Sequence, residues 1–135
     1  MIPPAPPLAS PRPRPQTLIG EWYRDGWTTP FLCVAFDGVP ESCGSLRLKA
    51  FRPAVSPDSA HDQTVLLRSG LEVLGQFTFS RQRSEVKSLT LPLPARAQPG
   101  PLQISLRVSR RLSPLLPDKR VLGVMLLDLY PEYDV

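Results

Sequence analysis

The chain has 135 residues, of which 41% are hydrophobic and 21% charged, and its formal net charge is +4 at pH 7. This length suits a single domain with its own hydrophobic core. The longest apolar run, residues 121–127, is too short for a transmembrane helix, which needs about 18 residues. No charged region followed by an apolar stretch opens the chain, so we expect no signal peptide and a cytoplasmic location.

The positive charge is compatible with an anionic partner or with simple solubility. Lysines and arginines are dispersed, however, and the sequence contains no run of five or more of them. We therefore do not expect nucleic acid to be a partner.

The first fifteen residues are rich in proline, with seven of the 18 prolines in the chain. This composition predicts an extended tail of polyproline II character over residues 1–15. The folded domain is expected over residues 16–135.

Eight segments have the apolar pattern of β-strands and are bounded by glycine, proline or polar residues. They are residues 17–24, 30–37, 45–52, 63–68, 71–79, 86–93, 102–108 and 121–130. No window has helical periodicity. The pattern predicts an all-β fold, an antiparallel two-sheet sandwich of about eight strands that resembles a jelly roll.

Two of these segments carry more specific expectations. Residues 71–79 place Leu71, Val73, Gly75, Phe77 and Phe79 on one face, which predicts that this face is buried. The closing segment, residues 121–130, is apolar at both odd and even positions, which predicts a central strand with both faces covered.

Residues that would indicate catalysis or metal binding are few. Cys33 and Cys43 match no zinc motif, and we expect two free thiols, with a disulfide across a hairpin as the alternative. The single histidine, His61, has only Asp62 beside it. We therefore expect no enzyme activity, no metal site and no cofactor.

Aromatic and charged residues are concentrated in one short stretch. Trp22, Arg24, Asp25 and Trp27 lie within six positions, with Asp25-Gly26 as a turn signal. Exposed tryptophan beside charged groups is typical of a sugar-binding site. The alternative is that the two tryptophans belong to the core and cover one end of the sandwich.

Two segments together resemble a known family. They read Gly20-Glu21-Trp22-Tyr23-x-Asp25-Gly26-Trp27 and Pro117-Asp118-x-Arg120-x-Leu122-Gly123-Val124. The chain from Leu18 to Tyr130 is similar to the β-sandwich accessory domains of unknown function attached to bacterial glycosyltransferases and other envelope-polysaccharide enzymes. Those domains open with a glycine-aromatic-tryptophan segment and end in a D-x-R-x-L-G strand.

The resemblance implies a galactose-binding-like jelly roll with a non-catalytic role, which is glycan binding or docking to a partner such as a glycosyltransferase. From the residues alone, Asp118 and Arg120 are expected to fix the turn into the last strand. Gly123 is expected to mark a bulge or a closely packed neighbour, such as a tryptophan lying over it. The leading hypothesis is therefore a carbohydrate-binding module with Trp22, Arg24, Asp25 and Trp27 as ligand contacts. The alternative is a protein-interaction or assembly module that binds no sugar.

Overall fold

The computed structural model describes residues 14–52, 62–80, 84–96, 100–110 and 120–133. All regular structure in these ranges is β. They contain no helix long and apolar enough to cross a membrane. The strands are β1 (Gln16–Ile19), β2 (Phe31–Phe36), β3 (Ser45–Arg52), β4 (Gln63–Ser69), β5 (Glu72–Phe79), β6 (Glu85–Pro92), β7 (Leu102–Val108) and β8 (Met125–Glu132).

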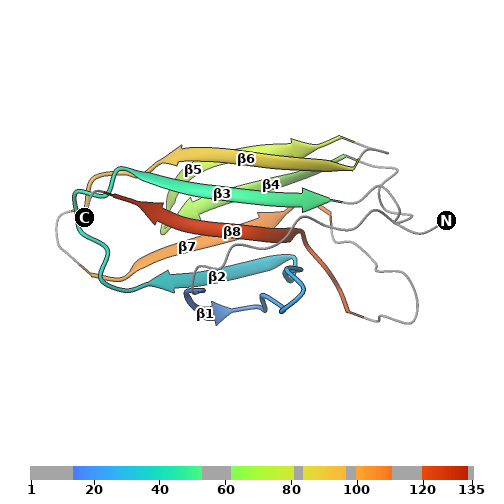
Figure 1. Cartoon of the computed structure of the whole chain (residues 1–135), viewed down its shortest axis with the longest axis horizontal. Helices are drawn as coiled ribbons and strands as arrows, with labels where there is room; N and C mark the ends of the chain where they lie inside the picture. The colour runs from blue at the N-terminus through green and yellow to red at the C-terminus, as the bar shows by residue number, and fades with distance from the viewer. Residues whose placement is uncertain (1–13, 53–61, 81–83, 97–99, 111–119, 134–135) are drawn as a thin grey trace.

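The eight strands form two antiparallel sheets, as Figure 1 shows. The larger sheet has the order β1-β2-β7-β4-β5, and the smaller has the order β6-β3-β8. Figure 1 looks onto the smaller sheet, and β1 and β2 extend beyond it below β8. The predicted all-β, two-sheet sandwich is confirmed.

Strand pairing follows the winding of a jelly roll. Strand β2 pairs with β7, β3 with β6, and β4 with β5, so that each pair is nested inside the one before. This nesting is typical of two interlocked Greek keys. The outermost pair, β1 with β8, is missing, because β1 pairs with β2 instead.

The core lies between the two sheets and is built by alternation along the strands. In β3, Leu46, Leu48 and Ala50 are buried, whereas Arg47 and Lys49 face away from the core. Strand β7 repeats this pattern, and its four apolar residues are all buried. A fully buried Leu or Ile side chain contributes about 1.5–3 kcal/mol. The predicted bounds of both strands are confirmed.

In β5, only part of the face that was predicted to be buried faces the core. Phe77 and Phe79 are buried as expected, but Leu71 is 95% exposed and Val73 is 55% exposed. The pairing with β4 shifts by one residue, and Leu74 is the extra residue of this bulge. Because Leu74 turns into the core, Val73 turns out of it, so the predicted burial of Leu71 and Val73 is wrong.

The prediction of a central closing strand is also wrong. Strand β8 lies at the edge of the smaller sheet and pairs only with β3. A bulge opposite Lys49 and Ala50 makes Leu127 the extra residue. Leu126 therefore faces the core, while Met125 and Leu127 pack on the other side of the sheet. The strand is apolar on both faces because a loop covers its second face.

The first strand is shorter than predicted. It ends at Ile19, and the next residue, Gly20, has a φ of 79°. A Cβ atom on Gly20 would clash with the backbone oxygen of Phe31 and with the side chain of Thr29. The chain therefore leaves the sheet here and turns toward β8.

Both cysteines are buried and free, so no disulfide joins them. Cys43 Sγ lies 3.3 Å from the backbone oxygen of Glu132. Burial raises the pKa of the Cys33 thiol, which lowers the fraction of reactive thiolate at neutral pH.

We expect neither cysteine to react with a thiol reagent such as 5,5′-dithiobis(2-nitrobenzoic acid) while the protein is folded. Both thiols should react once urea unfolds the chain, which provides the internal control. Rapid modification of either cysteine in the native protein would contradict the burial described above.

Candidate functional site

The segment from Trp22 to Thr28 lies along the free edge of β8. Leu126 N donates to Gly26 O at 2.7 Å, and Thr28 N donates to Val124 O at 2.9 Å. Trp27 forms an isolated β-bridge with Met125. In a complete jelly roll, another strand would pair with this edge of β8. Here the 22–28 segment occupies part of that position.

A tight turn gives the 22–28 segment its shape. Gly26 N donates to Tyr23 O at 3.0 Å, and Tyr23 N donates to Trp27 O at 2.8 Å. The Asp25 carboxylate accepts from Trp27 N at 3.2 Å, which is the local bond expected of aspartate in a turn. Gly26 has a φ of 99°, a conformation that glycine adopts without strain.

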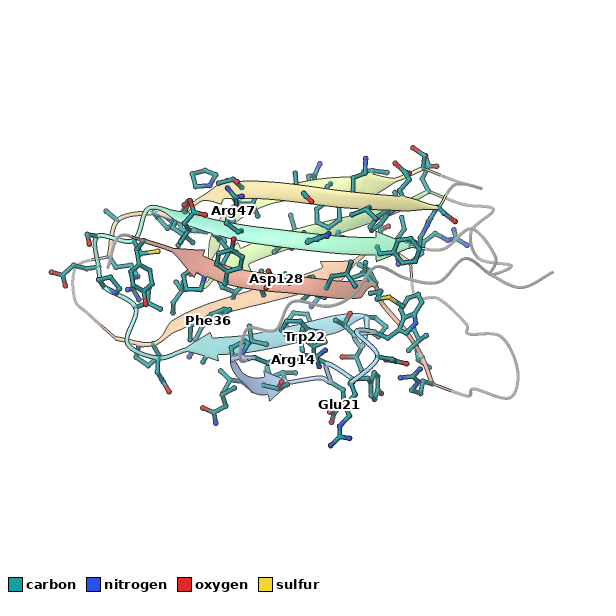
Figure 2. All side chains as sticks on the ribbon, viewed as in Figure 1. Arg14, Glu21, Trp22, Phe36, Arg47 and Asp128 are labelled. Carbon is teal, nitrogen blue, oxygen red and sulfur yellow. The ribbon has the colours of Figure 1, made fainter. Side chains whose placement is uncertain are left out.

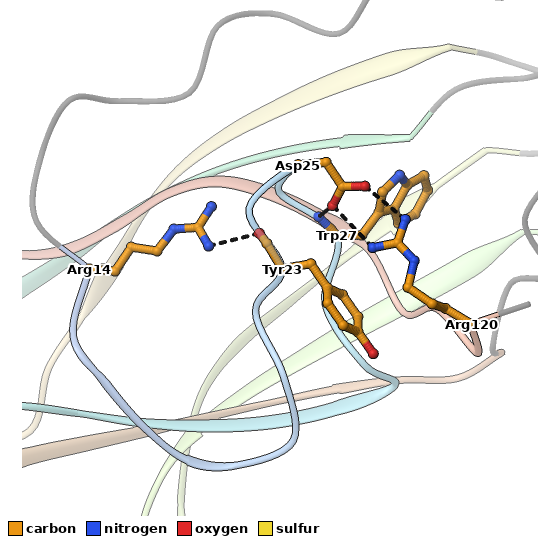
Figure 3. Close-up of polar contacts among 5 residues, drawn as sticks. All are labelled: Arg14, Tyr23, Asp25, Trp27 and Arg120. Atoms are coloured by element: carbon orange, nitrogen blue, oxygen red, sulfur yellow. Dashed lines mark hydrogen bonds and ion pairs between the residues drawn. The ribbon is translucent and has the colours of Figure 1, made fainter. Parts of the chain in front are cut away.

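Asp25 also connects this turn to the entrance of the last strand. Arg120 Nη2 lies 2.7 Å from Asp25 Oδ2, and Nη1 lies 3.3 Å from Oδ1 (Figure 3). The Arg120 guanidinium carbon lies 4.6 Å from the centroid of the Tyr23 ring. The two segments that carry the family resemblance thus meet in space. Asp118 lies outside the described residues.

Trp22 is tied to the scaffold by its indole nitrogen. Trp22 Nε1 donates to Leu126 O at 3.0 Å. The Arg14 guanidinium carbon lies 4.3 Å from the centroid of the Trp22 ring, and Arg14 Nη1 donates to Tyr23 O at 2.7 Å (Figure 3). Burial lowers the pKa of Arg14, an effect that the Asp25 carboxylate partly offsets. These contacts give Trp22 a structural role.

Gly123 lies at a close approach between two backbones. Its N–H donates to Thr28 O at 2.7 Å. A Cβ atom there would lie 2.5 Å from Thr29 O and 3.0 Å from the Cα atom of Pro30. The fully buried Thr28 side chain also donates to Val124 O at 3.0 Å. Gly123 thus has a close neighbour, but this neighbour is the chain at residues 28–30 and not the tryptophan suggested from the sequence.

Trp27 is placed differently from Trp22. It is partly buried and packs on Phe51, Met125 and Leu127, which face away from the main core. Its ring therefore lies at one end of the outer face of the smaller sheet. Arg24 is exposed at the turn.

The outer face of the smaller sheet carries polar side chains next to this apolar cluster. A depression of about 220 Å³ lies on it. It is lined by Arg47, Leu48, Lys49, Ser88, Leu89, Thr90, Asp128 and Tyr130. We call these residues and Trp27 the sheet-face site.

Strand register brings the polar groups of the sheet-face site together. Lys49 is opposite Asp128 in β8 and opposite Ser88 in β6. Arg47 is opposite Tyr130, and it forms an ion pair of 3.4 Å with Glu132. Figure 2 labels Arg47 and Asp128 on neighbouring strands of this sheet.

An aromatic side chain lies toward each end of the sheet-face site. Trp27 bridges to Met125 at the start of β8, and Tyr130 follows five positions later. Because Leu127 is an extra residue, these two positions are opposite Phe51 and Arg47 of β3, which are four residues apart. At the usual rise of a strand this separation is about 13 Å. The sequence did not indicate Tyr130 or its neighbours as site residues, because they come from three strands that only the sheet register brings together.

The described residues do not indicate a metal site. Among them, no three His, Cys, Asp or Glu side chains are grouped to hold a metal ion. His61 lies outside these residues. Comparison with protein-family models, with curated proteins and with solved structures gives no match for this chain. The resemblance to accessory domains of glycosyltransferases therefore stays a prediction.

We expect Gly123→Ala to lower the free energy of unfolding by about 1–3 kcal/mol, because the added methyl group forces two backbones apart. Urea unfolding measures this change. Gly44→Ala is the matched control, since a Cβ atom at Gly44 meets no atom within 4 Å. That substitution should change stability by no more than about 0.5 kcal/mol. Equal losses in the two variants would contradict the close approach at Gly123.

Proposed function

We propose that this chain is a non-catalytic carbohydrate-binding module whose ligand lies across the sheet-face site. The observation that carries the proposal is the row of polar side chains on an outer sheet face, with an aromatic ring toward each end. Sugars present both CH faces and hydroxyl groups, so a matching site needs aromatic surface and hydrogen-bonding groups together.

The parts of the sheet-face site suit this chemistry. Trp27 and Tyr130 supply aromatic surface. Lys49 and Asp128, which face each other across the strands, supply a donor and an acceptor for neighbouring hydroxyl groups. Thr90 adds a hydroxyl group on the β6 side. An extended glycan would lie along β8, from Trp27 toward Tyr130.

The proposal divides the four predicted ligand residues into two roles. Trp27 contacts the ligand. Trp22 and Asp25 are positioning residues, because their hydrogen bonds to Leu126 and Trp27 hold the segment that carries the Trp27 ring. Arg24 is exposed beside this segment, within reach of a ligand that extends past Trp27.

We place the module in the metabolism of bacterial envelope polysaccharides. The resemblance of residues 20–27 and 117–124 to domains attached to glycosyltransferases supports this assignment. The partner would then be a transferase that handles the same glycan, with this module holding the polymer near it.

A second candidate function is protein interaction or assembly without sugar binding. It is favoured by the exposed apolar side chains of Leu71 and Val73 at the outer edge of the larger sheet. An uncovered edge strand offers unpaired backbone groups to another chain. This function predicts self-association or a stable complex and no response to glycans.

We expect a glycan array to find a ligand, and calorimetry to show that Trp27→Ala and Tyr130→Ala each weaken its binding at least about fivefold, since each removes an aromatic contact. Tyr133→Ala is the control. It removes an exposed aromatic ring outside the sheet-face site and should leave the affinity unchanged.

Binding that survives both alanine substitutions in a protein that remains folded by urea titration would overturn the sheet-face site. Absence of any glycan ligand, together with a stable oligomer in light scattering, would favour the assembly function instead.

A further inference from the structure

We propose that the outer face of the larger sheet holds a second site, which binds a doubly charged phosphoryl group between Arg68 and Arg107. A hollow of about 420 Å³ lies on this face. It is lined by Phe31, Leu66, Arg68, Ser105 and Arg107. It is on the opposite side of the sandwich from the sheet-face site and shares no residue with it.

Strand register sets the two arginines diagonally across neighbouring strands. Arg68 of β4 is opposite Ser105 of β7, and Leu66 is opposite Arg107. Diagonal positions of this kind are about 7–8 Å apart, within reach of long side chains. The two guanidinium groups can therefore converge on one anion. Ser105, opposite Arg68 and two positions before Arg107, offers its hydroxyl group as a further donor.

The positive charge of this hollow is not balanced by the described part of the chain. No carboxylate lines the hollow, and neither arginine belongs to an ion pair among the described residues. Two like charges on neighbouring strands disfavour folding. A bound anion removes this repulsion and supplies acceptors for both guanidinium groups.

One contact orients Arg107. Its guanidinium carbon lies 5.0 Å from the centroid of the Phe31 ring, a cation–π contact that restricts its position. Arg68 lies beside the bulge that Leu74 makes in β5. Bulges are frequent beside binding sites.

The charges favour phosphate over carboxylate. Two guanidinium groups carry two positive charges, which a phosphoryl group matches at neutral pH, whereas a carboxylate supplies one negative charge. Planar guanidinium donors also fit pairs of phosphate oxygens. Leu66 and Phe31 form an apolar border that strengthens these charged hydrogen bonds by limiting access of water.

The test is titration of the full chain with inorganic phosphate at constant ionic strength, followed by NMR of the arginine Nε–Hε groups and by calorimetry. We expect the Arg68 and Arg107 signals to shift together. Arg68→Gln and Arg107→Gln should each weaken phosphate binding about tenfold or more, the usual effect of losing a charged hydrogen bond. Arg110→Gln removes an exposed charge outside the hollow and should leave the affinity unchanged.

Further titrations define the ligand. Tighter binding of glucose 1-phosphate than of inorganic phosphate would support the site and identify a sugar phosphate as its source, whereas equal binding would support a site for the free anion. Glucuronate binding as tightly as phosphate would overturn the choice of a phosphoryl group. No shift of either arginine signal, or an equal loss in Arg110→Gln, would overturn the site itself.

Discussion

The free edge of β8 is the constraint on which the rest of this structure depends. A strand that pairs on one side only leaves backbone donors and acceptors unpaired on the other, and β8 is apolar on both faces as well. The 22–28 segment provides hydrogen-bond partners for this edge and covers the second apolar face. It bonds the backbone at Leu126 and Val124, and it places the Trp27 ring over Met125 and Leu127. A segment near the start of the folded chain thus covers the edge and outer face of its last strand.

This arrangement gives the residues of the family resemblance a structural explanation. Asp25 shapes the turn and pairs with Arg120, and Gly123 allows the segment to approach β8. The segments 20–27 and 117–124 are far apart in the sequence, but their described residues form a single contact in the structure. The two outer faces of the sandwich, by contrast, differ in chemistry. The smaller sheet presents aromatic rings with both signs of charge, and the larger presents two arginines that form no ion pair within the described part of the chain.

Sequence reasoning succeeded where a strand follows a regular alternation between clear boundaries. The ranges of β3 and β7 were predicted to the residue for this reason. It failed at Leu74, because a bulge reverses the faces of a strand without any sign in the sequence. It also misplaced β8 within its sheet, because the Trp27 ring gives this edge strand the second apolar face that is typical of a central strand. The sheet-face site was beyond reach for a related reason. Its side chains come from three strands far apart in the chain, and only the register of β3 with β6 and β8 brings them together.

Hydrogen exchange of the two indole N–H groups, followed by NMR, tests most directly whether the 22–28 segment is part of the folded core. The Trp22 indole donates to Leu126 O, whereas the Trp27 indole N–H has no hydrogen bond within the described residues. We expect the Trp22 indole N–H to exchange more than about a hundredfold more slowly than a free indole, and the Trp27 indole N–H to exchange fast. Fast exchange at Trp22 would show that the segment detaches from β8 and would contradict its place in the folded core.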